Sequence, residues 1–122
     1  MDRDIKERTF DIGLRIIQLA AQLPETRTGK VLGYQVLRCG TSIGANVEEA
    51  VAAYSREDFA FKMSIALKEA RETHYWLRLV RDAGVLKPNR LDSILGETEE
   101  IKKILGSIVS KMRGNSKIKS QK

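Results

Sequence analysis

One run of residues in this chain has the spacing of a nucleophilic site. Gly40-Thr41-Ser42-Ile43-Gly44 matches G-x-S-x-G, the pattern around the reactive serine of many hydrolases. That pattern works only on a sharp strand-to-helix turn, with a histidine to accept the serine proton. Here it lies inside a helical pattern with no preceding strand, and the single histidine, His74, lies between the core positions Thr73 and Leu77. We therefore expect Ser42 to be structural and the protein not to be an enzyme.

The residue types that hold metals or cofactors do not occur at useful spacings. A di-iron site in a helical bundle needs Glu-x-x-His on two helices and two further glutamates, but His74 follows Glu69 by five residues and Glu72 by two. Cys39 is the only cysteine, which excludes an internal disulfide and a cysteine-based zinc site. Gly29-Lys30 lacks the glycine spacing and the Ser/Thr of a phosphate loop. We expect no metal and no cofactor.

A polar ladder is the strongest remaining candidate for a site. Arg38, Ser42, Asn46 and Glu49 recur at steps of three and four, on one edge of an apolar helical face. Side-chain pairs at these spacings stabilise an exposed helix by only about 0.2–0.5 kcal/mol each. The row could instead join two helices or two subunits. Lys62 and Glu69 are possible partners. A structural or interface role is favoured over a ligand site.

Positive charge is concentrated at the C-terminal end. Five of the 22 basic residues fall in the last twelve positions, which contain no acid, and this leaves 17 basic against 16 acidic residues elsewhere. The high isoelectric point therefore belongs mainly to this end of the chain. It either keeps the protein in solution or binds RNA or another polyanion. The candidate nucleic-acid contacts are Lys111, Arg113, Lys117, Lys119 and Lys122.

Four helical segments must position these residues. Hydrophobic spacing and breaking residues predict helices over about 4–22, 30–53, 56–82 and 88–112. Ser55 is a good N-cap, Gly84 a natural helix end, and Pro88 suits a first helical turn. The short connections favour antiparallel neighbours. We predict one all-α domain over residues 1–112, an up-down-up-down four-helix bundle, with a basic and disordered tail over 113–122.

Two of these segments carry more apolar surface than one bundle needs. The first has two apolar stripes, and the third has a core seam with further large side chains opposite. Gly40 and Gly44 lie four apart, where a neighbouring helix could approach closely. The excess predicts self-association. The candidate oligomer-interface residues are Ile5, Ile12, Phe61, Ile65, Tyr75, Trp76 and Leu79.

The chain shows no signal for export or membrane insertion. Its N-terminus is charged from the second residue, unlike a signal peptide, and no apolar run approaches the roughly 20 residues that span a bilayer. We expect a cytoplasmic protein with no membrane partner.

The centre of the chain resembles a known bacterial family, the 23S rRNA intervening-sequence proteins, also called four helix bundle proteins. The resemblance is carried by the runs Gln35-Val36-Leu37-Arg38, Thr41-Ser42-Ile43-Gly44-Ala45-Asn46 and Glu49-Ala50, by Ser55 and Asp58-Phe59, and by Ser64 to Thr73 with Tyr75-Trp76-Leu77 and Leu79. Cys39-Gly40 replaces a Ser/Arg-Ala pair of the family, and His74 stands where an acid is common. Neither difference threatens the fold.

This resemblance implies a four-helix bundle that assembles into a ring, typically a homopentamer, with no established catalytic activity. Two hypotheses follow for this chain. The first is a non-enzymatic ring that contacts RNA through clustered basic tails. The second is a ring-forming scaffold for another protein, with no role in nucleic-acid binding. The near-neutral body of the chain favours the second. The basic end favours the first, as does the gene context of the family, whose members are encoded within intervening sequences of 23S rRNA genes or elsewhere in bacterial genomes.

Overall fold

The computed structural model describes residues 4–120, and their side chains as far as residue 114. Four long helices form the molecule: α1 (Ile5–Ala20), α2 (Arg27–Val51), α3 (Arg56–Asp82) and α4 (Asp92–Ser120), with a short 3₁₀ turn, η1 (Pro88–Arg90), before α4. No strand occurs between residues 4 and 120. The predicted all-α class and the four-helix bundle are therefore confirmed.

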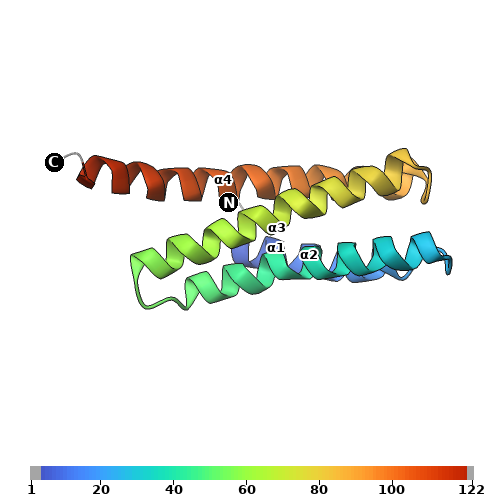
Figure 1. Cartoon of the computed structure of the whole chain (residues 1–122), viewed down its shortest axis with the longest axis horizontal. Helices are drawn as coiled ribbons and strands as arrows, with labels where there is room; N and C mark the ends of the chain where they lie inside the picture. The colour runs from blue at the N-terminus through green and yellow to red at the C-terminus, as the bar shows by residue number, and fades with distance from the viewer. Residues whose placement is uncertain (1–3, 121–122) are drawn as a thin grey trace.

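The helices run back and forth along one long axis (Figure 1). The α2–α3 turn lies at one end of the molecule, and the α1–α2 and α3–α4 connections lie at the other, so consecutive helices run in opposite directions. α2 packs extensively on both α1 and α3, while α4 packs mainly on α3 and only lightly on α1. α2 therefore contacts both α1 and α3, and α4 completes the bundle against α3 and α1.

Short polar side chains start the helices. Asp4 accepts from the backbone N–H of Lys6 at 2.6 Å, and the Thr26 hydroxyl accepts from Gly29 at 3.0 Å. Ser55 caps α3 as predicted, because its hydroxyl accepts from the N–H of Asp58 at 3.0 Å. The C-terminal end of α3 is also as predicted.

Gly84 follows that end with φ of 72°, a left-handed conformation that suits glycine. The N–H of Val85 then donates to the carbonyl of Val80 at 3.0 Å, which closes the last turn.

The core follows the seams read from the sequence in α3 and α4. Both helices turn a row of small and aliphatic side chains inward, and the two threonines in these rows are fully buried. Each threonine hydroxyl donates to a carbonyl one turn back at 2.7 Å, Thr73 to Glu69 and Thr98 to Ile94, so neither buried group is left unsatisfied. The seam residues that the core contains include Met63, Ala66, Ala70, Leu77, Val80, Leu91, Ile94, Ile101 and Leu105.

α1 turns only one of its two apolar stripes to the core. Ile12 and Ile16 are fully buried, while Phe10, Leu14 and Ile17 on the other stripe are about half exposed. The assignment of Ile12 to an oligomer interface is therefore wrong, because no other chain can reach it. Periodicity shows that both stripes are apolar, but it does not say which one faces α2.

Two glycines of α2 explain how closely α1 docks. A Cβ at Gly40 would lie 2.7 Å from Cγ1 of Ile16, and one at Gly44 would lie 3.0 Å from the carbonyl oxygen of Thr9. Side chains at these two positions would push α1 away. The prediction that Gly40 and Gly44 permit a close helix approach is confirmed, and the neighbour is α1.

α4 differs from its predicted bounds at both ends. It begins at Asp92, because Pro88–Arg90 forms the separate turn η1, and its backbone remains helical to Ser120 instead of ending near residue 112. A Cβ at Gly114 would touch nothing within 4 Å, so this glycine costs only about 1 kcal/mol of helix propensity. One such residue does not end a helix that otherwise contains good helix formers.

Candidate functional site

The polar ladder of α2 meets two glutamates of α3. Arg38 Nη2 donates to Glu72 at 2.6 Å and to the side-chain oxygen of Gln35 at 3.0 Å. Arg38 Nη1 lies 3.8 Å from a carboxylate oxygen of Glu69. Glu69 is 8% exposed, which is unusual for a carboxyl group. Arg38, Glu69 and Glu72 form one cluster across the α2–α3 contact, called here the Arg38 cluster.

The two carboxyl groups of the Arg38 cluster have pKa values that shift in opposite directions. Burial raises the pKa of Glu69, and its hydrogen bond to Glu72 raises it further. Burial also acts to raise the pKa of Glu72, but hydrogen bonds from Arg38 and Glu69 outweigh it, so this pKa lies below its ordinary value. Glu72 is therefore the ionised partner of Arg38, and Glu69 retains a proton more readily.

Trp76 closes one side of the Arg38 cluster. Its indole Nε1 is buried and has no hydrogen-bond partner, although it lies near enough to Glu72 to help lower the pKa of that carboxyl group. The Trp76 ring also packs edge-to-face on Tyr75, with centroids 5.4 Å apart. Trp76 is half-buried against the core, so only part of it is available to another chain.

The other ladder residues bond mostly within α2. Ser42 Oγ donates to the carbonyl of Arg38 at 2.6 Å, and Asn46 Nδ2 donates to the carbonyl of Ser42 at 2.8 Å. The Ser42 hydroxyl also acts to lower the pKa of Glu69 across the contact. Glu49 lies exposed beside this row. The ladder thus joins α2 to α3 through Arg38 and Ser42. Glu69 is one of the partners predicted from the sequence, whereas Glu72 was not predicted.

The residues that resemble catalytic groups lie in structural positions. Ser42 is inside α2, not on a strand-to-helix turn. His74 lies between α3 and α4, with Nε2 3.2 Å from Glu99, and burial lowers its pKa. Cys39 is buried, and its thiol donates to the carbonyl of Gln35. Over the side chains that the structure describes, no group of three or more His, Cys, Asp or Glu residues could hold a metal ion.

The predicted interface residues fall into three classes of exposure. Phe61 and Tyr75 are about half exposed and Leu79 is 37% exposed. Ile5, Ile65 and Trp76 are half-buried, and Ile12 is fully buried. Phe61, Tyr75 and Leu79 lie on the outward side of α3, opposite its core seam. They remain candidates for an interface, together with exposed apolar residues of α1 and α2 that were not among the predicted ones.

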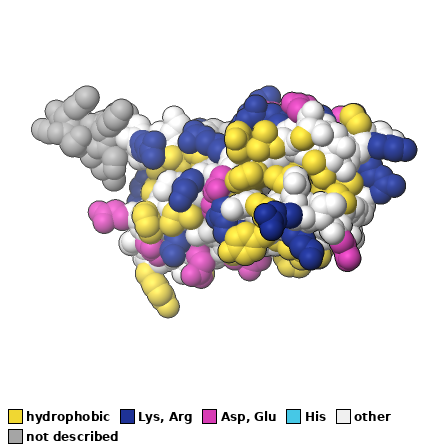
Figure 2. Space-filling view, turned by 45° about the vertical axis from the view of Figure 1, so that its right-hand side comes forward, with side chains coloured by type: hydrophobic (Ala, Val, Ile, Leu, Met, Phe, Trp, Pro, Cys, Tyr) yellow, Lys and Arg dark blue, Asp and Glu magenta, His cyan; other side chains and the backbone are white. Residues whose placement is uncertain are grey.

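Hydrophobic and basic side chains share the visible surface of the bundle. Figure 2 shows hydrophobic side chains over a broad face, with Lys and Arg side chains beside and between them. Arg78 lies over the ring of Tyr75, with its guanidinium carbon 5.8 Å from the ring centroid. Within the described part of the chain, no helix is long and apolar enough to cross a membrane.

The candidate nucleic-acid contacts lie at the far end of α4. Lys111 and Arg113 are exposed, beyond Val109, the last buried residue of the described core. Lys117 and Lys119 belong to the helical backbone, but their side chains lie outside those described, and Lys122 lies outside the described residues altogether. The structure therefore brings none of these five into a described site.

Two neutral substitutions in the Arg38 cluster should change stability in opposite directions. Because the pKa of Glu72 is lowered on folding, this carboxylate stabilises the native state above its unfolded pKa, and the gain is lost as pH falls through the folded value. Because the pKa of Glu69 is raised, its ionised form costs stability at neutral pH. Glu72→Gln should lower the urea midpoint at pH 7, and Glu69→Gln should hold or raise it. Both differences from the parent protein should shrink as the pH falls through the folded pKa values of the two carboxyl groups, first that of Glu69 and then that of Glu72. A Glu69→Gln loss as large as that of Glu72→Gln would contradict this assignment.

Known proteins share the sequence pattern and the fold of this chain. Residues 1–107 match the model of a family described as 23S rRNA-intervening sequence protein. A solved structure of a protein with unknown function from Bacteroides thetaiotaomicron VPI-5482, in the S23 ribosomal protein family, is 42% identical, with a TM-score of 0.81. The match covers 87% of this chain and 98% of that one. No curated protein matches. The chain belongs to the 23S rRNA-intervening sequence protein family.

Proposed function

We propose that this protein is a non-enzymatic, cytoplasmic helical bundle that assembles into a closed homo-oligomer, a pentamer, and that its clustered C-terminal ends bind RNA or a similar polyanion. Assembly is supported by the apolar surface left outside the core. Patches of this kind commonly mark contact sites between proteins. The large hydrophobic side chains that remain exposed include Phe10, Leu14, Ile17, Val31, Tyr34, Leu37, Val51, Phe61, Tyr75 and Leu79.

The polyanion role is supported by where the charge lies. The basic end contains five Lys or Arg residues and no acid, and a ring would bring several copies of it together. Flexible basic side chains bind phosphate groups largely without regard to base sequence. The basic end lies beyond residue 107, where the family match stops. Binding through it would therefore be a property of this chain rather than of the whole family.

A protein scaffold with no nucleic-acid role is the second candidate. It is favoured by the near balance of 17 basic and 16 acidic residues outside the basic end. Interfaces between proteins are enriched in aromatic and Arg side chains, and the Tyr75–Arg78 pair on α3 is of this kind. In this reading the basic end only keeps the ring in solution.

The assembly proposal predicts a closed oligomer in solution. Light scattering coupled to size exclusion should give one species of about five chain masses of 13.8 kDa, unchanged by a tenfold dilution from the micromolar range. The reason is that each Å² of apolar surface buried against another chain stabilises the oligomer by about 25 cal/mol. A monomer at micromolar concentration would remove the assembly proposal.

A further inference from the structure

Polar contacts bridge α1 and α4, which pack only lightly on each other. On α1 these contacts start from one face, because Arg8, Arg15 and Gln22 lie seven residues apart, close to two helical turns. Arg8 forms a bidentate ion pair with Glu97, donating from Nε at 3.0 Å and from Nη2 at 2.7 Å. In this contact the guanidinium and carboxylate charges balance.

Further along α1, two arginines contact neutral oxygens instead. Arg15 Nη2 donates to the hydroxyl oxygen of Ser93 on α4 at 2.9 Å. Arg90, in the η1 turn before α4, donates to the side-chain oxygen of Gln22. Among the described side chains, neither arginine forms an ion pair. Each guanidinium therefore keeps its positive charge, and has N–H groups left for a further acceptor.

Both arginines line one cavity, called here the Arg15–Arg90 cavity. Its volume is about 210 Å³, and it is lined by Arg15, Gln18, Leu19, Gln22, Arg90 and Ile94. Leu19 and Ile94 belong to the core and are only 5% and 2% exposed, so the cavity reaches down to apolar side chains. None of the six lining residues is acidic. The cavity therefore combines two positive charges with an apolar floor.

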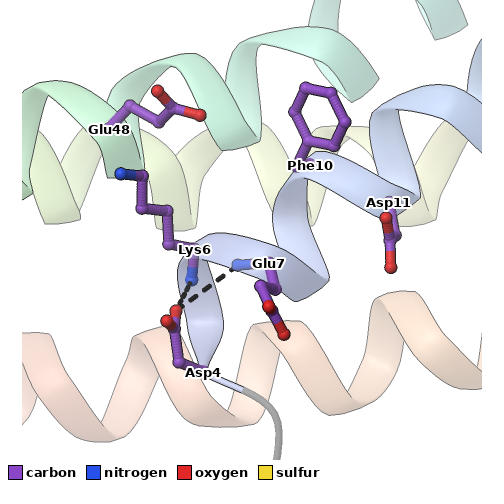
Figure 3. Close-up of a pocket in the computed structure, with 6 residues that line it drawn as sticks. All are labelled: Asp4, Lys6, Glu7, Phe10, Asp11 and Glu48. Carbon is purple, nitrogen blue, oxygen red and sulfur yellow. Dashed lines mark hydrogen bonds between the residues drawn. The ribbon is translucent and has the colours of Figure 1, made fainter.

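The other described cavities include acidic side chains. Figure 3 shows a larger one, of about 630 Å³, which is lined by Asp4, Lys6, Glu7, Phe10, Asp11 and Glu48. A cavity of about 450 Å³ shares Arg15 and Gln18 with the Arg15–Arg90 cavity, but it also contains Asp11 and Glu97. An anion would meet carboxylates in both of these, whereas the lining of the Arg15–Arg90 cavity has none.

The lining of the Arg15–Arg90 cavity suits a phosphate group. Guanidinium groups bind phosphate oxygens through parallel N–H donors, and the side-chain amide of Gln18 offers a neutral donor beside them. A terminal phosphate carries about −1.5 to −2 charges at pH 7, which matches two arginines. Small-molecule sites usually enclose about 300–1,000 Å³, so this smaller cavity suits the phosphate group itself. Its apolar floor strengthens the attraction, because it excludes water from one side.

We propose that the Arg15–Arg90 cavity binds a phosphate group that is not esterified twice. A free phosphate ion and the 5′-phosphate of an RNA strand both offer this chemistry, whereas an internal phosphodiester carries a single charge. The bound group would connect Arg15 on α1 to Arg90 before α4, and so would strengthen a light helix contact. The proposal goes beyond the proposed function, because it stands whether or not the basic end binds RNA.

The first test is calorimetric titration of the full-length protein with inorganic phosphate at constant ionic strength. Binding should saturate at one site per chain. Arg15→Gln with Arg90→Gln should raise the dissociation constant at least tenfold. The matched control, Arg56→Gln with Arg71→Gln, removes the same charge from exposed positions on α3 and should leave it unchanged. Arg15→Lys with Arg90→Lys keeps the charge but loses the planar donors, and should also weaken binding. Circular dichroism should show the same helix content in all of them.

The second test distinguishes the two sources of phosphate. Two RNA oligomers of one sequence, ending in a 5′-phosphate or a 5′-hydroxyl, are compared by fluorescence polarisation. If the strand end is the source, the phosphorylated oligomer should bind at least tenfold more tightly, and Arg15→Gln with Arg90→Gln should abolish the difference. If the free ion is the source, inorganic phosphate should bind and the two oligomers should bind alike. The basic end contributes equally to both oligomers, so their difference isolates the cavity.

Other results would overturn the inference. If neither inorganic phosphate nor the 5′-phosphate shows binding that depends on Arg15 and Arg90, the cavity is not a phosphate site. If the α3 control weakens phosphate binding as much as the cavity variant, general surface charge explains the binding. Loss of RNA affinity on removal of the basic end would leave this inference intact, since phosphate binding would persist in the shortened chain.

Discussion

Removal of residues 113–122 should lower the affinity of the assembled protein for RNA by at least two orders of magnitude at low salt. The deletion removes Arg113, Lys117, Lys119 and Lys122, four of the five clustered bases. Each base that neutralises a phosphate of a single strand contributes a salt slope of about −0.7. In a ring, one RNA that reaches several ends gains further affinity by avidity.

Fluorescence polarisation of a labelled, unstructured 30-mer RNA at two salt concentrations would measure this effect. The oligomer mass and melting temperature should stay close to those of the full chain, because Val109 is the last buried residue of the described core. A full-length control in which the same four bases are replaced by Gln should match the deletion. This would show that charge, rather than chain length, carries the binding.

Other results would redirect the proposal. If the truncated ring binds RNA as tightly as the full chain, the binding surface lies on the bundle, and exposed bases such as Lys68 and Arg71 become the next candidates. If neither form binds RNA at low salt, the scaffold function replaces the polyanion function. A strong preference for one RNA sequence would also contradict phosphate-based binding.

Much of this fold was predictable because local signals and the core pattern agree. The seam of α3 repeats at three and four residues, and Ser55 and Gly84 mark its ends by well-understood capping chemistry. The sequence is less informative where two solutions are equally apolar. On α1, either stripe could have faced the bundle, and the glycines of α2 favour the one that contains Ile16.

The candidate site was only partly predictable for a similar reason. The spacing of Arg38, Ser42 and Asn46 indicates one helical edge, but not which residues of α3 lie opposite. That depends on the axial position of α3 relative to α2. Hydrophobic spacing does not determine this position to better than one helical turn. Glu69 and Glu72 lie three residues apart on α3, so Arg38 can reach both.

Gly40→Val should destabilise the folded chain by about 3 kcal/mol, the upper end of the range for overpacked cores. A Cβ at this position would lie 2.7 and 2.8 Å from the two γ carbons of Ile16, whose side chain is fully buried and cannot move into solvent. The strain should displace α1 from α2. Native domains are stable by only about 5–15 kcal/mol, so the urea midpoint should fall markedly.

Two controls isolate the cause of that loss. Gly106→Val makes the same change on α4, where a Cβ has no close neighbour, and should change stability by less than about 0.5 kcal/mol. Ile16→Ala combined with Gly40→Val restores much of the total side-chain volume and should recover part of the loss, since the two side chains occupy the same space. The recovery would appear as a coupling energy in a double-mutant cycle.

The same substitution connects the fold to the proposed assembly. α1 carries three of the exposed apolar side chains that support the proposed assembly, Phe10, Leu14 and Ile17, so a displaced α1 should weaken the oligomer even under conditions where the monomer remains folded. Gly40→Val should therefore lower the urea midpoint and raise the dissociation concentration of the oligomer together, whereas Gly106→Val should change neither. If Gly40→Val costs no stability, α1 does not dock on α2 through Ile16, and the predicted effect on the oligomer has no cause.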